Sequence, residues 1–319
     1  MPHHNICLLG GSGFVGRHIC AALANRRARL RVLTRNASHH RDMLVIPNLE
    51  LIEVNVFDAK KLRAQLTGID TVINLIGILN ERRRGDFERV HVELPRQLIA
   101  ACREAGVSRL LHMCALGAAS DAPSRYLQTK AAGEQLVLAA NGDRFAVTSF
   151  RPSVIFGRGD SLFNRFAKLL RISPLVFPLP TPDARFSPVC IDDVAKAFIA
   201  SLDNRQSFGR SYELCGPRTY TLKELVEYTA DLSRHPRTII GLPDWASRLQ
   251  ARFLGLLPGK PYTLDNYLSA TVDNVCRQDG LAELGITDKI GIDAVVPHYL
   301  ASFVIRTRYN IYRQMARRK

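Results

Sequence analysis

Three glycines near the start of the chain are spaced as a phosphate-binding turn. Gly10, Gly13 and Gly16 follow an apolar run that predicts a β-strand and precede a run that predicts a helix. In such a turn the first glycine makes the sharp bend, the second lets the backbone approach a pyrophosphate, and the third lets the helix pack on the strand. The helix N-terminus then faces the phosphates. The sequence therefore predicts a dinucleotide site formed by Gly10, Gly11, Ser12, Gly13, Phe14, Val15 and Gly16.

A second pair of reactive side chains, Tyr126 and Lys130, lies four residues apart on a predicted helix, so both occupy one helix face. A free tyrosine keeps its proton to about pH 10, and a nearby lysine together with a nicotinamide cation lowers that pKa toward general acid–base work. The same spacing also occurs on ordinary amphipathic helices, where it has no catalytic meaning. The glycine turn upstream is what favours the catalytic interpretation.

Arg35 indicates which dinucleotide is bound. It ends the predicted strand 29–35, about twenty residues after the glycine turn, where an acidic residue would hold the ribose 2′-hydroxyl of NAD(H). A guanidinium instead suits a 2′-phosphate by charge and by geometry. We therefore expect NADP(H), with NAD(H) less favoured. The alternative is that Arg35 is one solvated arginine among many in a basic protein.

Predicted strands and helices alternate along the first two thirds of the chain. Strands are expected at 29–35, 49–54, 70–77, 108–113, 145–150 and 211–216, and helices at 58–66, 86–105 and from 192 to about 202. This alternation predicts an α/β fold with a doubly wound parallel sheet, whose ligands lie at the carboxyl ends of the strands. Further cofactor contacts are expected near that edge from Asn55, Val56, Leu75, Ile76, Gly77, Met113, Cys114, Pro152 and Val154, beside Tyr126 and Lys130.

With these motifs in this order, the chain resembles the short-chain dehydrogenase/reductase superfamily, in its extended and atypical, NAD-dependent epimerase/dehydratase-like branches. Five stretches look like the group around the nucleotide-binding accessory subunit of respiratory complex I and its bacterial relatives: 72–79, 115–118, 124–134, 151–157 and 187–195. The resemblance implies a Rossmann domain that holds NADP(H) and a small C-terminal domain over the nicotinamide end. It also implies that Tyr126 is the acid–base and Lys130 its modulator.

One position departs from the pattern of the active members. These carry a serine or threonine near the end of the fifth strand that hydrogen-bonds the substrate oxygen, whereas this chain has Cys114 and Ala115. A thiol is a weak donor, and losing such a donor costs about a hundred- to thousandfold in rate. Ser120 and Ser124 are close enough in sequence to be substitutes. The binding site looks complete, but the catalytic site does not.

We expect residues 1–157 and about 186–216 to form the NADP(H)-binding domain, and about 158–185 and 217–300 the small α/β C-terminal domain. Thr221 and Glu224 have the spacing of a capping box that opens a helix to about residue 233. Within 242–257, an apolar stripe recurs at helical spacing, formed by Trp245, Leu249, Phe253, Leu256 and Leu257. We interpret this stripe as a core face, with a lipid or quinone site as the alternative.

The net charge of +15 is concentrated at Arg82–Arg84 and in the tail 301–319. The tail has the pattern of a basic amphipathic helix, because Leu300, just before it, and Phe303, Val304, Ile311 and Met315 fall on one stripe. Contact with a membrane surface or an acidic respiratory-complex partner is therefore one expectation. A solvated tail is the other. No nucleic-acid recognition motif is present. With no apolar signal segment at the start, we expect the cytoplasmic side, with peripheral membrane contact.

The seven cysteines are scattered singly, without a C-x-x-C pair, so the sequence predicts neither a disulfide framework nor a zinc site. We expect them to be small core residues. The histidines likewise form no ligand pattern, and no metal site is expected.

Two functions from different classes fit these residues. The first is an NADP(H)-dependent oxidoreductase or epimerase-type enzyme acting on an unknown carbonyl or hydroxyl substrate. The second is a protein that holds NADP(H) without catalysis in a respiratory or quinone-related membrane assembly. Tyr126 and Lys130 favour the first, whereas Ala115 and the basic tail favour the second.

Overall fold

The computed structural model describes the whole chain except residues 1–4, 25, 27, 258–259, 261 and 301–319. The basic tail predicted at 301–319 therefore lies outside the described residues. Backbone contacts divide the chain into two compact units. Unit 1 comprises Met1–Ser153, Ile191–Cys215 and Cys276–Thr287, and unit 2 comprises Val154–Cys190, Gly216–Val275 and Asp288–Lys319.

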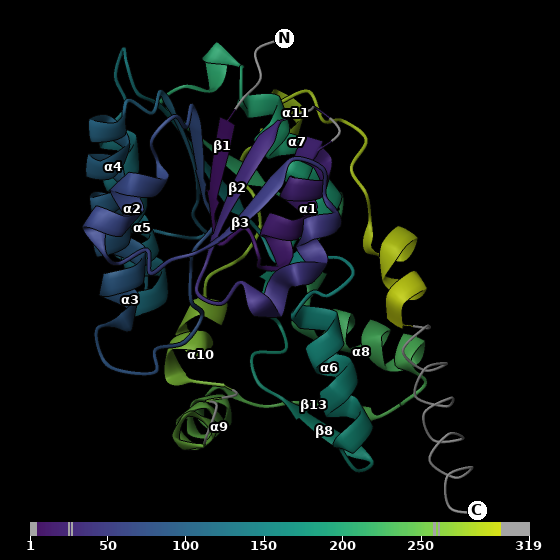
Figure 1. Cartoon of the computed structure of the whole chain (residues 1–319). Coiled ribbons are helices and arrows are strands. Elements are labelled where there is room, and N and C mark those ends of the chain that lie inside the picture. The colour runs from purple at the N-terminus through teal and green to yellow at the C-terminus, as the bar shows by residue number, and fades with distance from the viewer. Residues whose placement is uncertain (1–4, 25, 27, 258–259, 261, 301–319) are drawn as a thin grey trace, which may run out of the picture. The chain divides into compact units, whose positions relative to one another are not determined.

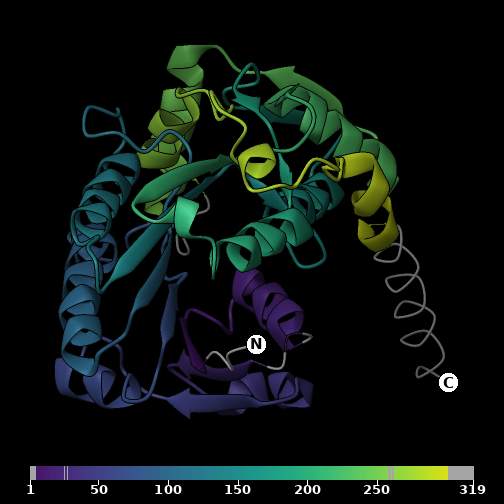
Figure 2. The same cartoon turned by 90° about the horizontal axis from the view of Figure 1, so that it is seen from above.

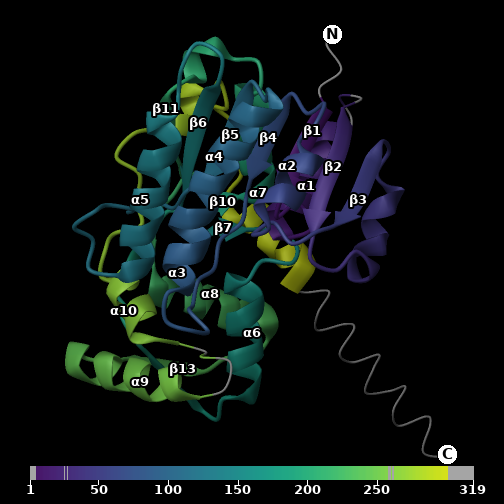
Figure 3. The ribbon, with the colours of Figure 1, turned by 60° about the vertical axis from the view of Figure 1, so that its left-hand side comes forward.

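Unit 1 is built on a seven-stranded parallel sheet with the strand order β11-β6-β5-β4-β1-β2-β3, visible from left to right in Figure 3. Its strands are β1 (Asn5–Leu9), β2 (Arg29–Thr34), β3 (Leu49–Glu53), β4 (Thr71–Asn74), β5 (Arg109–Met113), β6 (Ala146–Pro152) and β11 (Arg210–Leu214). Leu9 at the end of β1 is in register with Leu33 of β2 and Asn74 of β4, so these strands end at the same edge. The predicted doubly wound α/β fold is confirmed.

Helices cover both faces of this sheet (Figures 1 and 2). One face carries α2 (Ala59–Gln65), α4 (Leu94–Ala105) and α5 (Arg125–Ala139), and the other carries α1 (Phe14–Ala24) and α7 (Ile191–Ser201). Short turns are η1 (Ser38–Val45), α3 (Asp86–Glu88), η2 (Arg89–Glu93), η3 (Arg205–Ser207) and α11 (Gly280–Glu283). Leu62 of α2, Leu98 of α4 and Val137 of α5 are fully buried in one core cluster with strand residues. Burial of these side chains fixes α5, which carries Tyr126 and Lys130, to the sheet.

The continuous helix expected over 86–105 is wrong in its middle. The segment is split into α3, the π-helical turn η2 and α4. Pro95 lies in the first turn of α4 and has no amide hydrogen to donate to the carbonyl of His91 four residues earlier. That carbonyl instead approaches α5, because a Cβ at Gly133 would lie 1.8 Å from the His91 oxygen. Such π turns are frequent at functional sites.

Unit 2 contains α6 (Leu162–Ile172), α8 (Leu222–Ser233), α9 (Asp244–Leu256) and α10 (Leu264–Ala270). Its strands form two-stranded pairs: β7 (Ile155–Phe156) with β10 (Val189–Cys190), β9 (Arg185–Phe186) with β12 (Tyr220–Thr221), and β8 (Val176–Leu179) with β13 (Thr238–Gly241). Leu170 of α6, Val226 of α8 and Ile239 of β13 share a small core. The predicted capping box is confirmed, because Thr221 and Glu224 exchange side-chain and backbone hydrogen bonds.

The apolar stripe in α9 is not a core face, which corrects the sequence interpretation. Trp245, Leu249, Phe253 and Leu256 are 61–85% exposed, and Leu257 just after the helix is 40% exposed. The inward positions of α9 are the small residues Ser247 and Ala251. Helical spacing identifies a stripe, but the packing of small side chains decides which face of the helix is covered.

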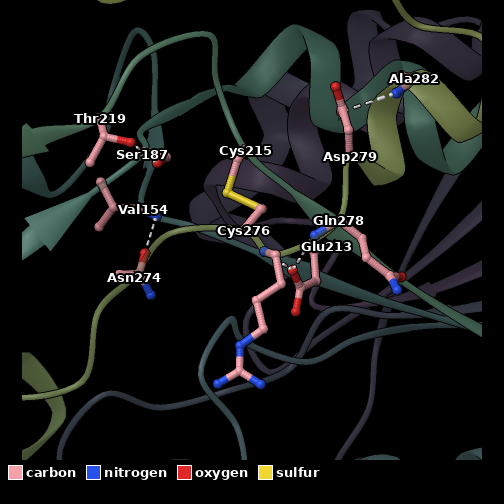
Figure 4. The surroundings of a disulfide bond; sticks show 11 residues. Val154, Ser187, Glu213, Cys215, Thr219, Asn274, Cys276, Gln278, Asp279 and Ala282 are labelled. Carbon is pink, nitrogen blue, oxygen red and sulfur yellow. Dashed lines mark hydrogen bonds between the residues drawn. A yellow bond between two sulfur atoms is a disulfide. The ribbon is translucent and has the colours of Figure 1, made fainter.

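A disulfide between Cys215 and Cys276 corrects the expectation that the cysteines are unpaired core residues (Figure 4). The two cysteines are 61 residues apart, and their Cα atoms lie 6.0 Å apart. They meet because the segment before α11 packs along β11: the Glu213 carboxylate accepts hydrogen bonds from the amides of Arg277 and Gln278, at 2.6 and 3.2 Å. The other five cysteines are buried and form no disulfide, as expected of core residues.

Within the described part of the chain, no helix is both long enough and apolar enough to cross a bilayer. The same residues contain no cluster of three or more potential metal-ligating side chains of the His, Cys, Asp or Glu type.

Candidate dinucleotide site

The glycine turn joins β1 to α1 in the geometry that a phosphate-binding turn needs. Gly10 has a φ of +77°, which favours glycine, and its carbonyl accepts a 3.0 Å hydrogen bond from the amide of Gly13. A Cβ at Gly16 would lie 2.4 Å from the backbone of Gly11, so only glycine allows α1 to pack this closely. The first turn of α1 begins at Phe14, next to the bend.

Gly13 differs from the other two glycines because its surroundings are open. A Cβ there would approach one atom closely, the Gly10 carbonyl oxygen at 3.2 Å, and the residue is exposed. A Cβ at Gly10, by contrast, would lie 3.1 Å from the backbone of Leu75 and 3.2 Å from that of Ile76. The turn thus lies directly beside the end of β4, and its open side is the side of Gly13.

Arg17, which the sequence analysis did not single out, lies next to this turn. Its Nε donates to the carbonyl of Ser12 at 3.0 Å, and its guanidinium pairs with Asp42 and lies 3.2 Å from Nδ1 of His40. The hydrogen bond from Arg17 lowers the pKa of the Asp42 carboxyl. Its position directly after Gly16 was the available sequence signal, but its partners come from η1, for which no helix or strand was expected.

Arg35 follows β2 at the same sheet edge, and its side chain is exposed. The loop after it is fixed to the end of β3, because the Ala37 amide donates to Glu53 at 2.8 Å. Asn55 and Val56 follow β3: the Asn55 side chain accepts from the Phe57 amide at 3.1 Å, and Val56 is buried.

Lys130 is a buried amine at the carboxyl ends of two strands. Its Nζ donates to the Met113 carbonyl of β5 at 2.7 Å, and a Cβ at Gly77, just after β4, would lie 3.7 Å from the same nitrogen. Burial lowers the pKa of Lys130. Gly77, Met113 and Lys130, predicted from separate parts of the sequence, are thus brought together.

Tyr126 lies one helical turn before Lys130 on α5, and its ring is half-buried. It packs edge-on against the rings of Phe87 and His91, with centroids 5.9 and 5.6 Å away. Edge-to-face contacts of this kind favour one orientation of the tyrosine ring.

His91, on the π turn, is the second residue that sequence reasoning missed. Burial, together with the charge of Lys130, lowers the pKa of His91 to about 3, so the ring is neutral. Its Nε2 accepts the Ile78 amide at 3.2 Å, which leaves the proton on Nδ1 to be donated to Thr129 Oγ1 at 3.0 Å. His91 therefore links the loop after β4 to α5, and a lone histidine in a sequence gives no signal of such a role.

Cys114, Ser120 and Ser124 are the side chains considered as donors to a substrate oxygen, and two of them form hydrogen bonds with α5. The Cys114 thiol donates to the Lys130 carbonyl at 3.5 Å, and burial raises its pKa to about 12. The Ser124 hydroxyl accepts the Leu127 amide at 3.2 Å as the N-cap of α5, and Ser120 is exposed. These hydrogen bonds of Cys114 and Ser124 thus stabilise α5.

Pro152 and Val154 lie on either side of the boundary between the units. Pro152, at the end of β6, is buried and accepts the Leu116 amide at 3.1 Å. Val154 belongs to unit 2, where its amide donates to Asn274 at 3.1 Å (Figure 4).

A doubly wound parallel sheet with a glycine turn after its first strand defines a dinucleotide-binding α/β protein. The chain belongs to the NAD dependent epimerase/dehydratase family, whose model matches residues 6–215. This confirms the resemblance to the extended short-chain dehydrogenases/reductases, and the family is nicotinamide-dinucleotide dependent.

The chain is similar to two relatives whose names differ in the function that they state. The chain is 29% identical over 318 residues to "NADH dehydrogenase [ubiquinone] 1 alpha subcomplex subunit 9, mitochondrial" of Rattus norvegicus, covering 97% of this chain and 81% of the relative. It is 30% identical over 244 residues to "Ceramide reductase" of Caulobacter vibrioides, covering 75% and 74%. Among solved structures, MoeE5 in complex with UDP-glucose and NAD has a TM-score of 0.68 at 19% identity, covering 96% of this chain and 99% of that one.

Proposed function

We propose that the protein binds NADP(H) and acts as a slow or specialised oxidoreductase or epimerase-type enzyme on an organic carbonyl or hydroxyl group. The observation that carries this proposal is the position of Lys130. Its buried amine lies at the carboxyl ends of β4 and β5, on the same helix as Tyr126. Burying an amine costs about several kcal/mol in desolvation, and titratable groups perturbed in this way cluster at functional sites.

The described residues fit a dinucleotide. The open side of Gly13 leaves room for a pyrophosphate, and a Cβ there would fill that room. Gly77, Met113 and Lys130 would hold the nicotinamide side, and Arg35 would hold the adenosine side. The bound cofactor would supply or accept a hydride. Tyr126, one helical turn before Lys130 on α5, would give or take the proton of the substrate oxygen.

Substitution of one arginine at each end of β2 tests the preference for NADP(H) over NAD(H). Arg35→Ala should narrow the affinity gap between NADPH and NADH by about 1–3 kcal/mol, because a charge-assisted phosphate contact is lost. Arg29→Ala, an exposed arginine at the other end of the same strand, is the matched control and should leave the gap unchanged. Fluorescence titration with both cofactors measures the gap. Equal affinities in the unmodified protein would defeat the NADP(H) assignment.

Catalysis is tested by NADPH oxidation across a panel of ketones and quinones. We expect slow turnover that Tyr126→Phe removes, because the proton source is deleted. Ala115→Ser should raise the turnover by restoring a donor to the substrate oxygen. Neither substitution touches the glycine turn, so cofactor affinity should change little in both. Fast turnover that survives Tyr126→Phe would point to a different acid.

A second candidate function is an accessory role, in which the protein holds NADP(H) without catalysis in a respiratory or quinone-related membrane assembly on the cytoplasmic side. This accessory role is favoured by Ala115, which has no hydroxyl, and by the hydrogen bond of the Cys114 thiol to the Lys130 carbonyl of α5. Similarity to a subunit named for NADH dehydrogenase also favours it. The basic tail 301–319 would supply the peripheral membrane or partner contact. Co-migration with a respiratory complex on native gels, unaffected by Tyr126→Phe, would support this role over the enzymatic one.

A further inference from the structure

We propose that the exposed apolar stripe of α9, formed by Trp245, Leu249, Phe253 and Leu256, is a docking surface for an anionic lipid bilayer. The proposal does not depend on the dinucleotide or on the tail 301–319. It concerns a surface of unit 2 whose composition and orientation are unusual for a folded protein.

The rotation of α9 about its axis is fixed by its inner face. The Ser247 hydroxyl donates to the Leu242 carbonyl at 3.3 Å and accepts the Thr181 amide at 3.3 Å, and Ala251 is fully buried. Arg248 adds a hydrogen bond from its Nε to the Tyr267 hydroxyl of α10, at 3.2 Å. Figures 1 and 3 place α9 beside α10 and the β8–β13 pair.

At 3.6 residues per turn, the stripe lies on the side of α9 opposite Ser247 and Ala251. Its four large side chains, spaced by four, four and three residues, are 71%, 61%, 65% and 85% exposed in chain order. This inverts the usual arrangement, in which large apolar side chains face the core and small polar ones face solvent. The stripe cannot turn inward without breaking the contacts of Ser247.

The charges around the stripe favour a negatively charged partner. From 234 to 260 the chain has the cations Arg234, Arg237, Arg248, Arg252 and Lys260 against one acid, Asp244. The Asp244 carboxylate is already engaged by Arg248 and by the Tyr267 hydroxyl. Arg252 is exposed and lies at the edge of the stripe.

The chemistry of the side chains selects a bilayer as that partner. A helix with tryptophan, phenylalanine and leucine on one face and arginines at its edge is the pattern that inserts into the boundary between headgroups and acyl chains. Tryptophan is favoured at that depth because its ring is apolar and its N–H is polar. The turn between α6 and β8 repeats the combination, with exposed Ile172, Leu175 and Val176 after Arg165, Lys168 and Arg171. Ten of the thirteen large apolar side chains that are exposed among the described residues belong to unit 2, which places the apolar surface there and not in unit 1.

Trp245 is the only tryptophan of the chain, so its emission reports on the proposed surface directly. The full-length protein is titrated with phosphatidylcholine vesicles that contain or lack phosphatidylglycerol. We expect a blue shift with the anionic vesicles, a weaker one without phosphatidylglycerol, and quenching of Trp245 by brominated acyl chains. An emission spectrum that the anionic vesicles do not change, or equal binding to both lipids, would overturn the proposal.

Variants separate this surface from the tail. The double substitution Leu249→Gln and Phe253→Gln should lower the vesicle partition coefficient at least about tenfold, since two apolar side chains that would enter the bilayer are lost. Leu44→Gln with Val45→Gln removes equally exposed apolar side chains from η1 of unit 1 and should change nothing. Unchanged NADPH affinity and circular dichroism verify the fold of each variant.

Two results with these variants would contradict the proposal. Partition that the stripe variant leaves unaltered would show that lipid contact is made elsewhere. A concentration-dependent dimer in sedimentation, abolished by the stripe variant and accompanied by no vesicle binding, would assign the surface to a second copy of the chain instead.

Discussion

At the scale of single residues, the three glycines of the turn have different reasons to be glycine. Gly10 needs a positive φ, Gly16 needs the absence of a Cβ for α1 to pack, and Gly13 has neither constraint. A side chain at Gly13 would enter the open side of the turn without meeting the protein core. The most direct physical reason for a glycine there is the close approach of a ligand.

Gly13→Val should therefore abolish NADPH binding while the protein remains folded, because the valine side chain would occupy the pyrophosphate position. Isothermal titration and thermal melting measure the two effects separately. Gly142→Ala, at a glycine with nothing within 4 Å, is the control and should alter neither. Undiminished binding by folded Gly13→Val protein would show that the turn does not hold the phosphates.

At the scale of elements, α5 is fixed to the sheet by the buried carboxylate of Glu134. It accepts hydrogen bonds from Ser149 and Arg151 of β6, at 2.6 and 2.8 Å, and from Ser211 of β11 at 2.9 Å. Burial alone would raise the pKa of Glu134, but the hydrogen bonds and the Arg151 charge outweigh it and leave the pKa below its usual value. One side chain thus sets the position of the helix that carries Tyr126 and Lys130.

Glu134→Gln should lower the free energy of unfolding by about 2–4 kcal/mol at neutral pH, since Arg151 loses its counter-charge. Because the folded pKa is depressed, the contribution is complete above the unfolded pKa of about 4.3 and is lost as the pH falls through the folded pKa. Urea unfolding of both proteins should therefore show a difference that shrinks below roughly pH 4. Glu104→Gln, which removes the exposed partner of Arg63, should cost less than about 1 kcal/mol. A difference between Glu134→Gln and the unmodified protein that persists unchanged at low pH would contradict this account.

At the scale of the whole molecule, the disulfide joins the point where the chain leaves unit 1 for the second time to the point where it next returns. Cys215 is the last residue of unit 1 before the segment 216–275, and Cys276 is the first after it. The bond therefore closes the loop that forms the longest of the three segments of unit 2, and closing a loop of this length restricts the unfolded chain.

Reduction with dithiothreitol should lower the free energy of unfolding by up to about 4 kcal/mol on the chain-entropy model. The double variant Cys215→Ser with Cys276→Ser should have this lower free energy of unfolding without any reductant, and dithiothreitol should not change it. Thiol titration of the denatured protein should find five free thiols before reduction and seven after it. Seven thiols in unreduced protein would show that the bond is absent.

The sequence by itself determined the elements and the class of fold. Each expected strand from Arg29 to Gly216 is present within a few residues. Thr221 and Asp58 cap helices because each side chain accepts a hydrogen bond from the amide three residues ahead. Periodicity and capping are local, so they can be read along the chain. The spacing of Gly10, Gly13 and Gly16 is local in the same sense.

The tertiary structure alone decided the features that depend on distant neighbours. The helix expected over 86–105 is broken at η2: Pro95 leaves the His91 carbonyl without its helical donor, and the packing of α5 decides that this carbonyl lies against Gly133. The α9 stripe faces outward because Ser247 and Ala251 fit the inner surface, and Cys215 meets Cys276 because the segment before α11 packs along β11. A pattern in the sequence states what a face contains, but which face is covered, and by what, depends on side chains far away in the chain.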